Sequence, residues 1–507
     1  MTAPRAEAAR RAGLLYLGVD GHTEGASVPK TPTGIPGFDQ VAMGGLPTRR
    51  ATVVAGQAGS AKSVFAGQFL AEGVRRGEPG VFVTLEEPAA DLRANLATLG
   101  FDVAAWEDAG DWRFVDASPL ATADGVTPYD LEILAAQIGH AVDATGAQRL
   151  VLDSLNAVLS LQDDAAAARQ MLRQLIASLR SLGLTVVLTV ETPGDPGGTL
   201  SRYGIEEFVA DNVVLLRNVR EGSFRRRTLE VLKMRGAMHH KGDVPFTVVP
   251  GQGLVVLPVG ERVQSQTRFD ERTSSGNAGL DGLMHGGVFR GASTLLTGPT
   301  GTGKTLLATQ FVGDALVRGE SVLLMAYEET REQAYENGAT WGYDFAGFAE
   351  QGLLHVVSVY PEVGSLDDHL VEIRSLVERH RPTRLVVDSL SALERLGTEP
   401  SYRQFVIGLT SFVKQIGLAT LLTASSPTLV GGTSITAGHI SGLIDAIVVL
   451  RYVEVDSTLR RGILVVKMRG SSHEQEIREL IIGDGTMTVG EPFRGINAIL
   501  GSGGLPV

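Results

Sequence analysis

The most informative segment of this 507-residue sequence reads Gly298-Pro299-Thr300-Gly301-Thr302-Gly303-Lys304-Thr305. It has the Gly-x-x-x-x-Gly-Lys-Thr spacing, it follows an apolar strand-like run, and a stretch with helical apolar spacing comes after it. Glycines in such a loop let backbone N–H groups turn toward phosphate oxygens, while the lysine reaches the outer phosphates and the threonine hydroxyl faces magnesium. The segment therefore predicts a nucleotide-binding site that uses Mg²⁺.

A second loop of the same kind occurs near the start of the chain and reads Gly56-Gln57-Ala58-Gly59-Ser60-Ala61-Lys62-Ser63. Ser63 is a magnesium ligand equivalent to Thr305, but Ala61 replaces the last glycine. Its methyl group is tolerable if the residue has a negative φ angle, and on that condition we expect this loop to bind nucleotide as well. The alternative is a decayed loop that binds none.

Further motifs occur twice along the chain, in the same order. The pairs are Gly34–Asp39 with Gly276–Asp281, Leu85–Glu87 with Tyr327–Glu329, Leu152–Leu155 with Val387–Leu390, and Lys233–Gly236 with Lys467–Gly470. Chance does not produce an ordered set of this kind, and a unit of about 230 residues is too long for a solenoid repeat. The chain is therefore a tandem duplication in which each copy is a domain.

Short apolar runs alternate with segments of helical spacing within each copy, which is typical of an α/β fold with a mostly parallel sheet flanked by helices. In the first copy we expect strands at 52–55, 81–84, 150–152 and 185–188, and helices at 64–74 and 165–182. The domains we expect are a flexible tail at 1–28, a first domain at 29–257, a linker at 258–272, a second domain at 273–490 and a short tail at 491–507.

The composition excludes several classes of protein. Hydrophobic residues make up 43% of the chain, which allows a sizeable core, and the absence of cysteine excludes disulfides, Cys-based zinc sites and thiol nucleophiles. Lys+Arg 45 against Asp+Glu 57 gives a net charge of −12, which argues against a protein whose main task is to hold a nucleic-acid backbone. No apolar run reaches the roughly 18 residues that span a membrane, so we expect a soluble cytoplasmic protein.

Acidic residues follow apolar strands beside both loops. Asp153 and Asp388 end such strands, where a carboxylate facing a magnesium ion is expected, with a helix N-cap as the alternative. The pairs Glu86-Glu87 and Glu328-Glu329 follow another strand. A carboxylate near the γ-phosphate can polarise a water or a hydroxyl, and two adjacent carboxylates raise each other's pKa, which suits a general base. The alternative is a solvated strand end.

Two cation pairs, Lys233 with Arg235 and Lys467 with Arg469, close the two domains on a strand that follows a polar hairpin. Neither pair is near its own phosphate loop in sequence. Such a pair can act as an arginine finger on the nucleotide of the next subunit, and head-to-tail contacts of this kind must close into a ring. Solvated surface charge is the alternative.

Together with Arg202–Phe208, Arg226–Glu230 and Phe405–Gly408, these motifs make the chain resemble the KaiC family over about residues 30 to 500. The family consists of double-domain RecA-like ATPases and autokinases of the circadian clock. The resemblance implies two tandem RecA-like P-loop domains and a homohexameric double ring that binds ATP and Mg²⁺ at subunit interfaces. It implies a slow ATPase in the first ring, and in the second a serine/threonine autokinase that later removes the phosphate.

The resemblance also assigns roles to individual residues. The expected ATP-binding residues are Gly56, Gly59, Ser60, Ala61, Lys62, Ser63, Lys233, Arg235, Gly298, Thr300, Gly301, Thr302, Gly303, Lys304, Thr305, Lys467 and Arg469. The expected magnesium ligands are Ser63, Asp153, Thr305, Glu328 and Asp388, and the expected catalytic residues are Glu86, Glu87, Glu328 and Glu329. The expected phosphoacceptors are Ser441 and Thr436.

The sequence departs from the clock pattern in two places. Gly442 occupies the position of a threonine acceptor, so ordered phosphorylation of an adjacent serine and threonine cannot occur, and Ala437 replaces an acidic neighbour of Thr436. The chain stops at Val507, before the longer tail that recruits KaiA, so we do not expect control by KaiA. A KaiB-like partner on the first domain is more plausible.

Two functions of other classes remain open at this point. A RecA-like nucleic-acid motor or recombinase would need basic loops lining a ring pore, and Arg225–Arg227 is the only strong basic cluster. A scaffold that binds ATP only to assemble would not need the paired glutamates. An ATPase assay separates the second of these from an enzyme, and salt-dependent DNA binding would support the first.

Overall fold

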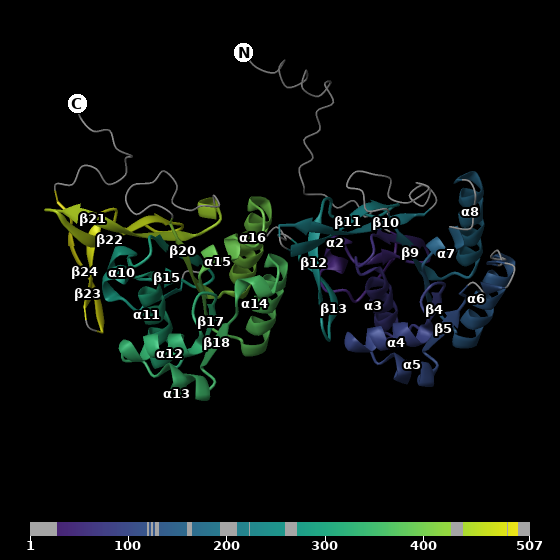
Figure 1. The fold of residues 1–507 in the computed structure, drawn as a ribbon, viewed down its shortest axis with the longest axis horizontal. Helices are drawn as coiled ribbons and strands as arrows, with labels where there is room; N and C mark the ends of the chain where they lie inside the picture. The colour runs from purple at the N-terminus through teal and green to yellow at the C-terminus, as the bar shows by residue number, and fades with distance from the viewer. Residues whose placement is uncertain are drawn as a thin grey trace, which may run out of the picture.

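The computed structural model describes residues 28–118, 121–122, 125–126, 131–159, 165–192, 210–222, 224–258, 271–426, 440–483 and 485–494. Two α/β domains lie side by side, each built on a nine-stranded sheet (Figure 1). This arrangement confirms the predicted class, two tandem domains with mostly parallel sheets flanked by helices. In the described part of the chain, no helix is both long enough and apolar enough to cross a membrane.

The first sheet has a parallel half and an antiparallel edge. Its order is β13-β12-β11-β10-β3-β9-β8-β4-β5, in which the strands from β10 to β5 run parallel and β11, β12 and β13 are antiparallel additions. The strands are β3 (Ala51–Gly56), β4 (Gly80–Thr84), β5 (Trp112–Asp116), β8 (Arg149–Asp153), β9 (Thr185–Glu191), β10 (Asn212–Glu221), β11 (Phe224–Met234), β12 (Val244–Val249) and β13 (Gly253–Val256). The four expected strands of the first copy therefore all form.

Helices cover both faces of this sheet, because its parallel strands are apolar on both sides. They are α2 (Phe38–Val41), α3 (Lys62–Arg75), α4 (Ala89–Thr98), α5 (Val103–Ala109), α6 (Leu131–Thr145), α7 (Asn156–Leu159) and α8 (Ala165–Ser181). One buried cluster joins the sheet to α6 and α8, and a second joins its other face to α3. The helices expected at 64–74 and 165–182 correspond to α3 and α8.

The second domain repeats this plan, with sheet order β18-β17-β19-β20-β16-β21-β22-β23-β24. The strands are β16 (Ser293–Gly298), β17 (Val322–Ala326), β18 (Leu354–Ser358), β19 (Arg384–Asp388), β20 (Ala419–Ser425), β21 (Ala446–Val455), β22 (Thr458–Met468), β23 (Arg478–Gly483) and β24 (Thr486–Pro492). The helices are α10 (Ala278–Leu283), α11 (Lys304–Val317), α12 (Arg331–Thr340), α13 (Phe345–Glu350), α14 (Leu366–His380), α15 (Leu390–Glu394) and α16 (Glu399–Ile416), with 3₁₀ turns η1 (Pro361–Val363) and η2 (Ile440–Gly442). Two-stranded pieces complete the fold: β1 (Lys30–Thr31) with β2 (Leu46–Pro47), β6 (Ala121–Thr122) with β7 (Gly125–Val126), and β14 (Arg272–Thr273) with β15 (Val288–Phe289).

A fully buried arginine anchors the same place in each domain, at the start of β8 and of β19. Arg149 donates to Glu78 at 2.6 Å and to the carbonyls of Pro32 and Phe69 at 2.9 and 2.7 Å. Arg384 donates to Glu320 at 2.9 Å, and also to the carbonyls of Ser274 and Phe311. Each guanidinium thus ties the central sheet to the P-loop helix and to the segment that enters the domain.

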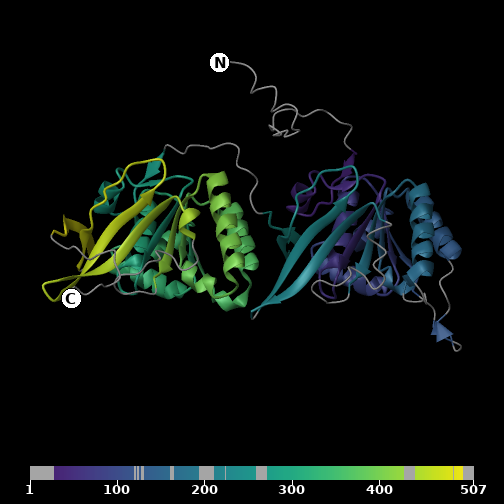
Figure 2. The same cartoon turned by 90° about the horizontal axis from the view of Figure 1, so that it is seen from above.

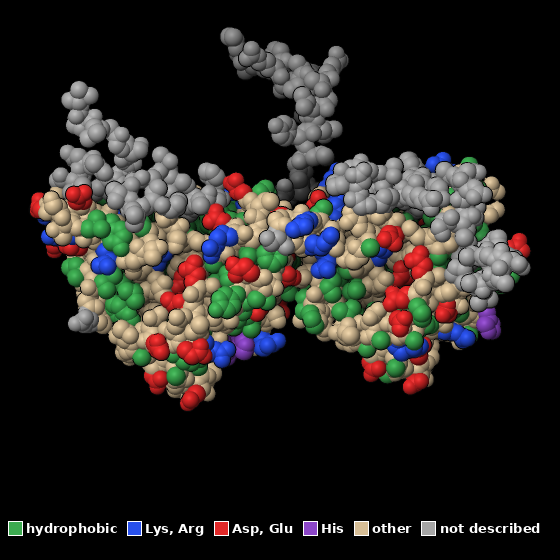
Figure 3. All heavy atoms as spheres, in the orientation of Figure 1, with side chains coloured by type: hydrophobic (Ala, Val, Ile, Leu, Met, Phe, Trp, Pro, Cys, Tyr) green, Lys and Arg blue, Asp and Glu red, His purple; other side chains and the backbone are tan. Residues whose placement is uncertain are grey.

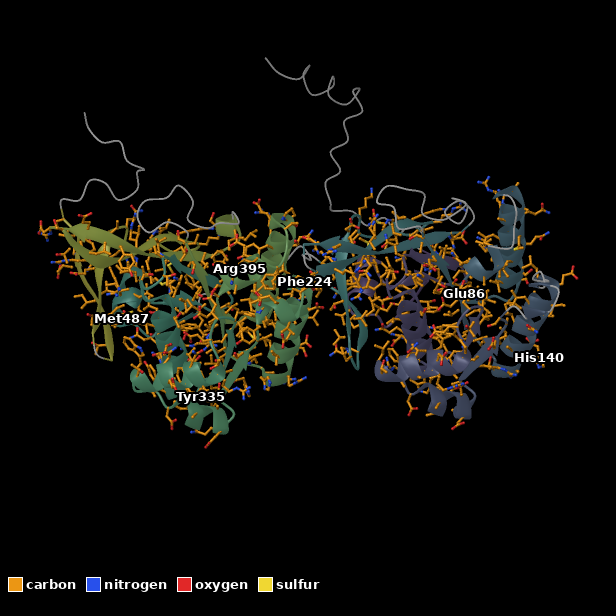
Figure 4. The ribbon with its side chains drawn as sticks, in the orientation of Figure 1. Glu86, His140, Phe224, Tyr335, Arg395 and Met487 are labelled. Atoms are coloured by element: carbon orange, nitrogen blue, oxygen red, sulfur yellow. The ribbon has the colours of Figure 1, made fainter. Side chains whose placement is uncertain are left out.

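The two domains meet where the β10–β11 hairpin approaches α14 and α16 (Figure 2). Phe224 lies at this junction (Figure 4) and packs, with Val249 and Val255, against the core of the second domain. Arg226 donates to Asp367 at 3.1 Å and to Gln404 at 2.5 Å. Arg226 belongs to the basic cluster Arg225–Arg227, which was considered for nucleic-acid binding, and it makes an interdomain contact instead.

Candidate active sites

The phosphate loop and the acidic residues of each domain meet at one edge of its sheet. In the first domain the loop leaves β3 at Gly56, Glu86-Glu87 follows β4, and Asp153 ends β8. Because β3, β4 and β8 belong to one parallel set, their carboxyl ends share an edge. In the second domain β16, β17 and β19 bring Gly298, Glu328-Glu329 and Asp388 together in the same way. Each predicted set of loop and carboxylates is therefore one site.

Both P-loop lysines open a helix and turn back over the loop. Lys304 donates to the carbonyls of Gly298 and Pro299 at 2.9 and 3.0 Å, and Lys62 donates to the carbonyl of Gln57 at 3.0 Å. Partial burial lowers the pKa of each lysine, and the neighbouring carboxylates Asp153 and Asp388 oppose that shift. The ammonium groups are thus held at the start of α3 and α11, where backbone N–H groups also favour an anion.

The backbone of Ala61 differs from our expectation. It has a φ of 70° and a ψ of 31°, in the left-handed region, so the negative φ that we set as the condition for tolerating the methyl group is not found. The equivalent glycine, Gly303, has a φ of 105°. The reason is that the loop must turn sharply into the first turn of the helix, and this turn keeps its geometry although the residue carries a methyl group. The methyl group packs against the core beside α3.

The proposed magnesium ligands are hard oxygen donors placed beside the lysines. Thr305 donates a hydrogen bond to Asp388, whose pKa is raised above its ordinary value, chiefly by burial. A threonine hydroxyl on the adjacent strand also donates to each aspartate, Thr189 to Asp153 and Thr423 to Asp388. Neither aspartate is an N-cap.

In the described residues, no group of three or more acidic or histidine side chains gathers as a metal cage. One hydroxyl and one carboxylate beside a phosphate loop fit Mg²⁺, which is usually held by one or two carboxylates together with substrate phosphates.

The two glutamates of each pair have different neighbours. Ser389 donates to Glu328 at 2.9 Å, from the residue directly after Asp388. The second glutamates, Glu87 and Glu329, each accept from an asparagine on the following helix. Burial is the main cause that raises the pKa of Glu86, Glu87 and Glu329. Figure 4 shows Glu86 within the first domain.

Glu191 lies at the first site and was not predicted from the sequence. It ends β9 opposite Gly56, and it is the carboxylate whose charge most opposes the lowering of the pKa of Lys62. Asn156 fixes its backbone, accepting from the N–H of Glu191 at 2.8 Å. Ser425 pairs with Gly298 at the same place in the second domain, so the two sites differ here in charge. The signal was present in the sequence as an acidic residue directly after the buried run 185–190.

The two cation pairs, at the ends of β11 and β22, lie toward the amino ends of the parallel strands, whereas the phosphate loops lie at the carboxyl ends. Lys233 pairs with Val213, which pairs with Val53, the third of the six residues of β3, and Arg235 follows the end of β11. In the second domain, Lys467 pairs with Ile447, which pairs with Leu295. The arginines are half-exposed there, with Arg235 3.7 Å from Asp211 and Arg469 3.7 Å from Asp445. These cations and their own loops are therefore not brought together within one chain.

The proposed acceptor lies at the cation edge. Ser441 is in the turn η2, which precedes β21, and its carbonyl accepts from Lys467 at 2.7 Å. Arg469 donates to the carbonyl of Gly442 at 2.6 Å. Thr436, the other expected acceptor, and the segment Arg202–Phe208 lie outside the described residues.

A cavity of about 360 Å³ opens beside the first phosphate loop. Lys62, Ser63 and Glu87 line its polar side, and leucines of α4 line the other. An apolar wall next to a phosphate site is the arrangement that a flat base with attached phosphates requires.

Comparisons with known proteins agree with this geometry. The family model of the KaiC ATPase matches residues 31–261 and again residues 273–493. The circadian clock protein KaiC3 of Synechocystis sp. is 48% identical over 484 residues, covering 95% of both chains. The circadian clock oscillator proteins KaiC of Synechococcus elongatus and Parathermosynechococcus lividus are each 42% identical. The alignments cover 94% of this chain and 92% of the first, and 93% of this chain and 87% of the second.

Proposed function

This chain belongs to the KaiC family of ATPases, and from that premise we propose that it forms a homohexameric double ring. ATP binds at the interfaces between subunits. The first ring hydrolyses ATP, and the second ring transfers the γ-phosphoryl group to Ser441 and later removes it. The names of the relatives contain the words circadian clock, which support a timing or signalling role. We place that role in the cytoplasm as part of the proposal. We also propose a KaiB-like partner for the first domain, and this proposal depends on the family resemblance alone.

The observation that carries this proposal is the separation of loop and cations on opposite edges of both sheets. An extended strand rises about 3.3 Å per residue, so each cation pair lies on the order of 10 Å or more from its own loop. A second subunit, docked with its cation edge on the first one's loop edge, brings them together. Head-to-tail docking of this kind generates a ring when the rotation between successive subunits closes, and we propose that it closes with six subunits.

In the first ring, Lys62 and the N–H groups at the start of α3 bind the outer phosphates, and Ser63 and Asp153 would hold Mg²⁺. The ion, when bound, neutralises charge that develops on the phosphate oxygens. Glu87 or Glu86 accepts a proton from a water. The water oxygen then bonds to the γ-phosphorus, the bond to the β–γ bridging oxygen breaks, and ADP and phosphate leave. Burial raises the pKa of both glutamates above the ordinary value, and a carboxylate of higher pKa is a stronger base for the proton of the water.

In the second ring the nucleophile is the Ser441 hydroxyl of the neighbouring subunit. Lys304 and the start of α11 bind the phosphates, and Thr305, Asp388 and Glu328 would hold Mg²⁺. Glu329 or Glu328 takes the hydroxyl proton as the new oxygen–phosphorus bond forms and ADP departs. Lys467 already binds the Ser441 backbone, so the acceptor and the cation of one subunit reach the neighbour's site together.

Nucleic-acid binding is the weaker alternative. On the face drawn in Figure 3, basic side chains stand in small groups among acidic ones, without a continuous basic stripe. A protein that tracks a phosphate backbone needs such a stripe.

The test combines light scattering with intact-mass analysis of the purified chain. With ATP and Mg²⁺ we expect hexamers and one phosphate per chain, and Ser441→Ala should keep the hexamer and lose the phosphate. Phosphate that persists in Ser441→Ala would refute this acceptor, and a chain with no phosphate at all would be an ATPase without kinase activity. Single protomers at saturating ATP would refute the interfacial sites.

A further inference from the structure

The second glutamate of each pair has a partner on the helix that follows. Asn95 of α4 donates its side-chain amide to Glu87 at 2.8 Å, and Asn337 of α12 donates to Glu329 at 2.9 Å. Both asparagines lie eight residues after the glutamate that they bind, so the contact bridges the strand-to-helix connection in the same way twice.

The helices that carry these asparagines have otherwise diverged. The sequence of α4 is AADLRANLAT and that of α12 is REQAYENGAT. Only Asn95, Ala97 and Thr98 recur, as Asn337, Ala339 and Thr340. A helix that served only to cover the sheet would need its buried positions, but even these changed, since Leu92 and Leu96 correspond to Ala334 and Gly338. The asparagine has remained although the packing around it was rebuilt.

The geometry points to a positioning role, and we propose that Asn95 and Asn337 hold Glu87 and Glu329 in the orientation that accepts the proton of the attacking water or hydroxyl. This inference rests on the proposed function. An amide N–H bonded to one carboxylate oxygen fixes the rotation of the side chain and leaves the other oxygen to face the reacting group. The asparagine is neutral, so it orients the carboxylate without pairing its charge. In the first domain, Asn95 and Glu87 line the same cavity as Lys62 and Ser63.

The paired glutamates thus have separate supports. Glu328 is held from the strand side by Ser389, and Glu329 is held from the helix side by Asn337. Both glutamates lie on the connection between strand and helix, but each has its own hydrogen-bond donor. Loss of Asn337 therefore leaves Glu329 free to rotate, while Ser389 still holds Glu328 in place. This predicts a loss of turnover with unchanged nucleotide binding. Outer contacts that orient metal ligands are typically worth about 10–100-fold in activity, and we expect an effect of the same order for the contact that orients this base.

The experiment is a double-mutant cycle in the full-length protein, measuring kcat and KM for ATP hydrolysis. Asn95→Leu should lower the hydrolysis that depends on Glu87 about tenfold at unchanged KM and unchanged affinity for a fluorescent ATP analogue. In the Glu87→Gln background it should lower turnover no further, because the asparagine acts through the glutamate. Asn95→Gln keeps an amide donor and should recover part of the activity. If the leucine variant does not fold, the glutamine variant is compared with the wild type in its place.

Matched controls come from the preceding residue of each helix. Ala94→Leu and Glu336→Leu occupy equivalent exposed positions on α4 and α12 and should leave kcat unchanged. For the second domain, Asn337→Leu is scored by the rate at which phosphate appears on Ser441. An unchanged kcat in Asn95→Leu, or a loss that adds fully to that of Glu87→Gln, overturns the inference but leaves the ATPase intact. A wild-type protein without ATPase activity would instead refute the proposed function together with it.

Discussion

Ala61 shows how a single methyl group distinguishes the two phosphate loops. A non-glycine residue in the left-handed region costs about 1–2 kcal/mol, and replacement by glycine returns about 0.4–1 kcal/mol of chain entropy to the unfolded state. We therefore expect Ala61→Gly to raise the free energy of unfolding of the nucleotide-free protein by about 0.5–1 kcal/mol. Urea unfolding followed by tryptophan fluorescence measures it, since the three tryptophans include Trp106 and Trp112 of the first domain.

The reverse change in the second loop is the control. Gly303→Ala should destabilise the protein, because the residue has a φ of 105° and its new Cβ would lie 3.0 Å from the side chain of Ile482. Equal stability of Ala61→Gly and the wild type would show that the first loop relaxes without strain.

The raised pKa of Glu86 and Glu87 predicts how hydrolysis responds to acid. Burial favours the protonated form of both carboxyls, and a base must be ionised to accept a proton. As the pH falls, hydrolysis by the first domain should therefore begin to decline above the ordinary pKa of a glutamate. A pH–rate profile of kcat, in a Ser441→Ala background that removes the acceptor, measures this limb. If the decline began only at the ordinary glutamate value, neither residue would be the base.

At the scale of elements, local patterns predict the sheet strands and miss the contacts between segments distant in sequence. The predicted strands 52–55 and 81–84 lie within β3 and β4, because fully buried strands carry a continuous apolar run. The bond between Lys467 and Ser441 depends on strand register, which no local pattern shows. The condition of a negative φ at Ala61 is not met, because the turn into the helix, and not the residue's own preference, sets φ there.

Helix α16 offers a test of such a long-range contact. Its N-cap, Thr398, makes no side-chain capping bond, and Glu221 of the first domain accepts from the Thr398 N–H at 2.9 Å and from its hydroxyl at 2.5 Å. Loss of a cap costs about 1 kcal/mol. Glu221→Ala should therefore destabilise the second domain by about that amount and speed hydrogen exchange at the Thr398 amide. Arg220→Ala is the control, since Arg220 donates within its own hairpin to Gly222. Equal exchange at Thr398 in the two variants would contradict the capping role.

At the scale of the whole molecule, the proposed function requires each phosphate loop to be completed by the cations of a neighbouring chain. A chain with Lys62→Ala keeps the cations Lys233 and Arg235, but its first phosphate loop is inactive. A chain with Lys233→Ala and Arg235→Ala keeps that loop and lacks the cations. Both retain the second domain, so on the proposed function both should still assemble through the second ring.

Mixing these two chains distinguishes sites shared between subunits from sites within one chain. Alone, each variant should hydrolyse ATP only at the background rate of its second ring. In hexamers that contain equal amounts of both at random, about a quarter of the first-ring interfaces join an intact loop to intact cations. Hydrolysis after subunit exchange should therefore rise to about a quarter of the first-ring rate of the wild type, because each head-to-tail interface takes its loop from one chain and its cations from the next. The unmixed variants, carried through the same exchange, are the controls. A mixture that stays at the background rate would mean that each chain's cations serve its own loop, and the interfacial sites of the first ring would have to be abandoned.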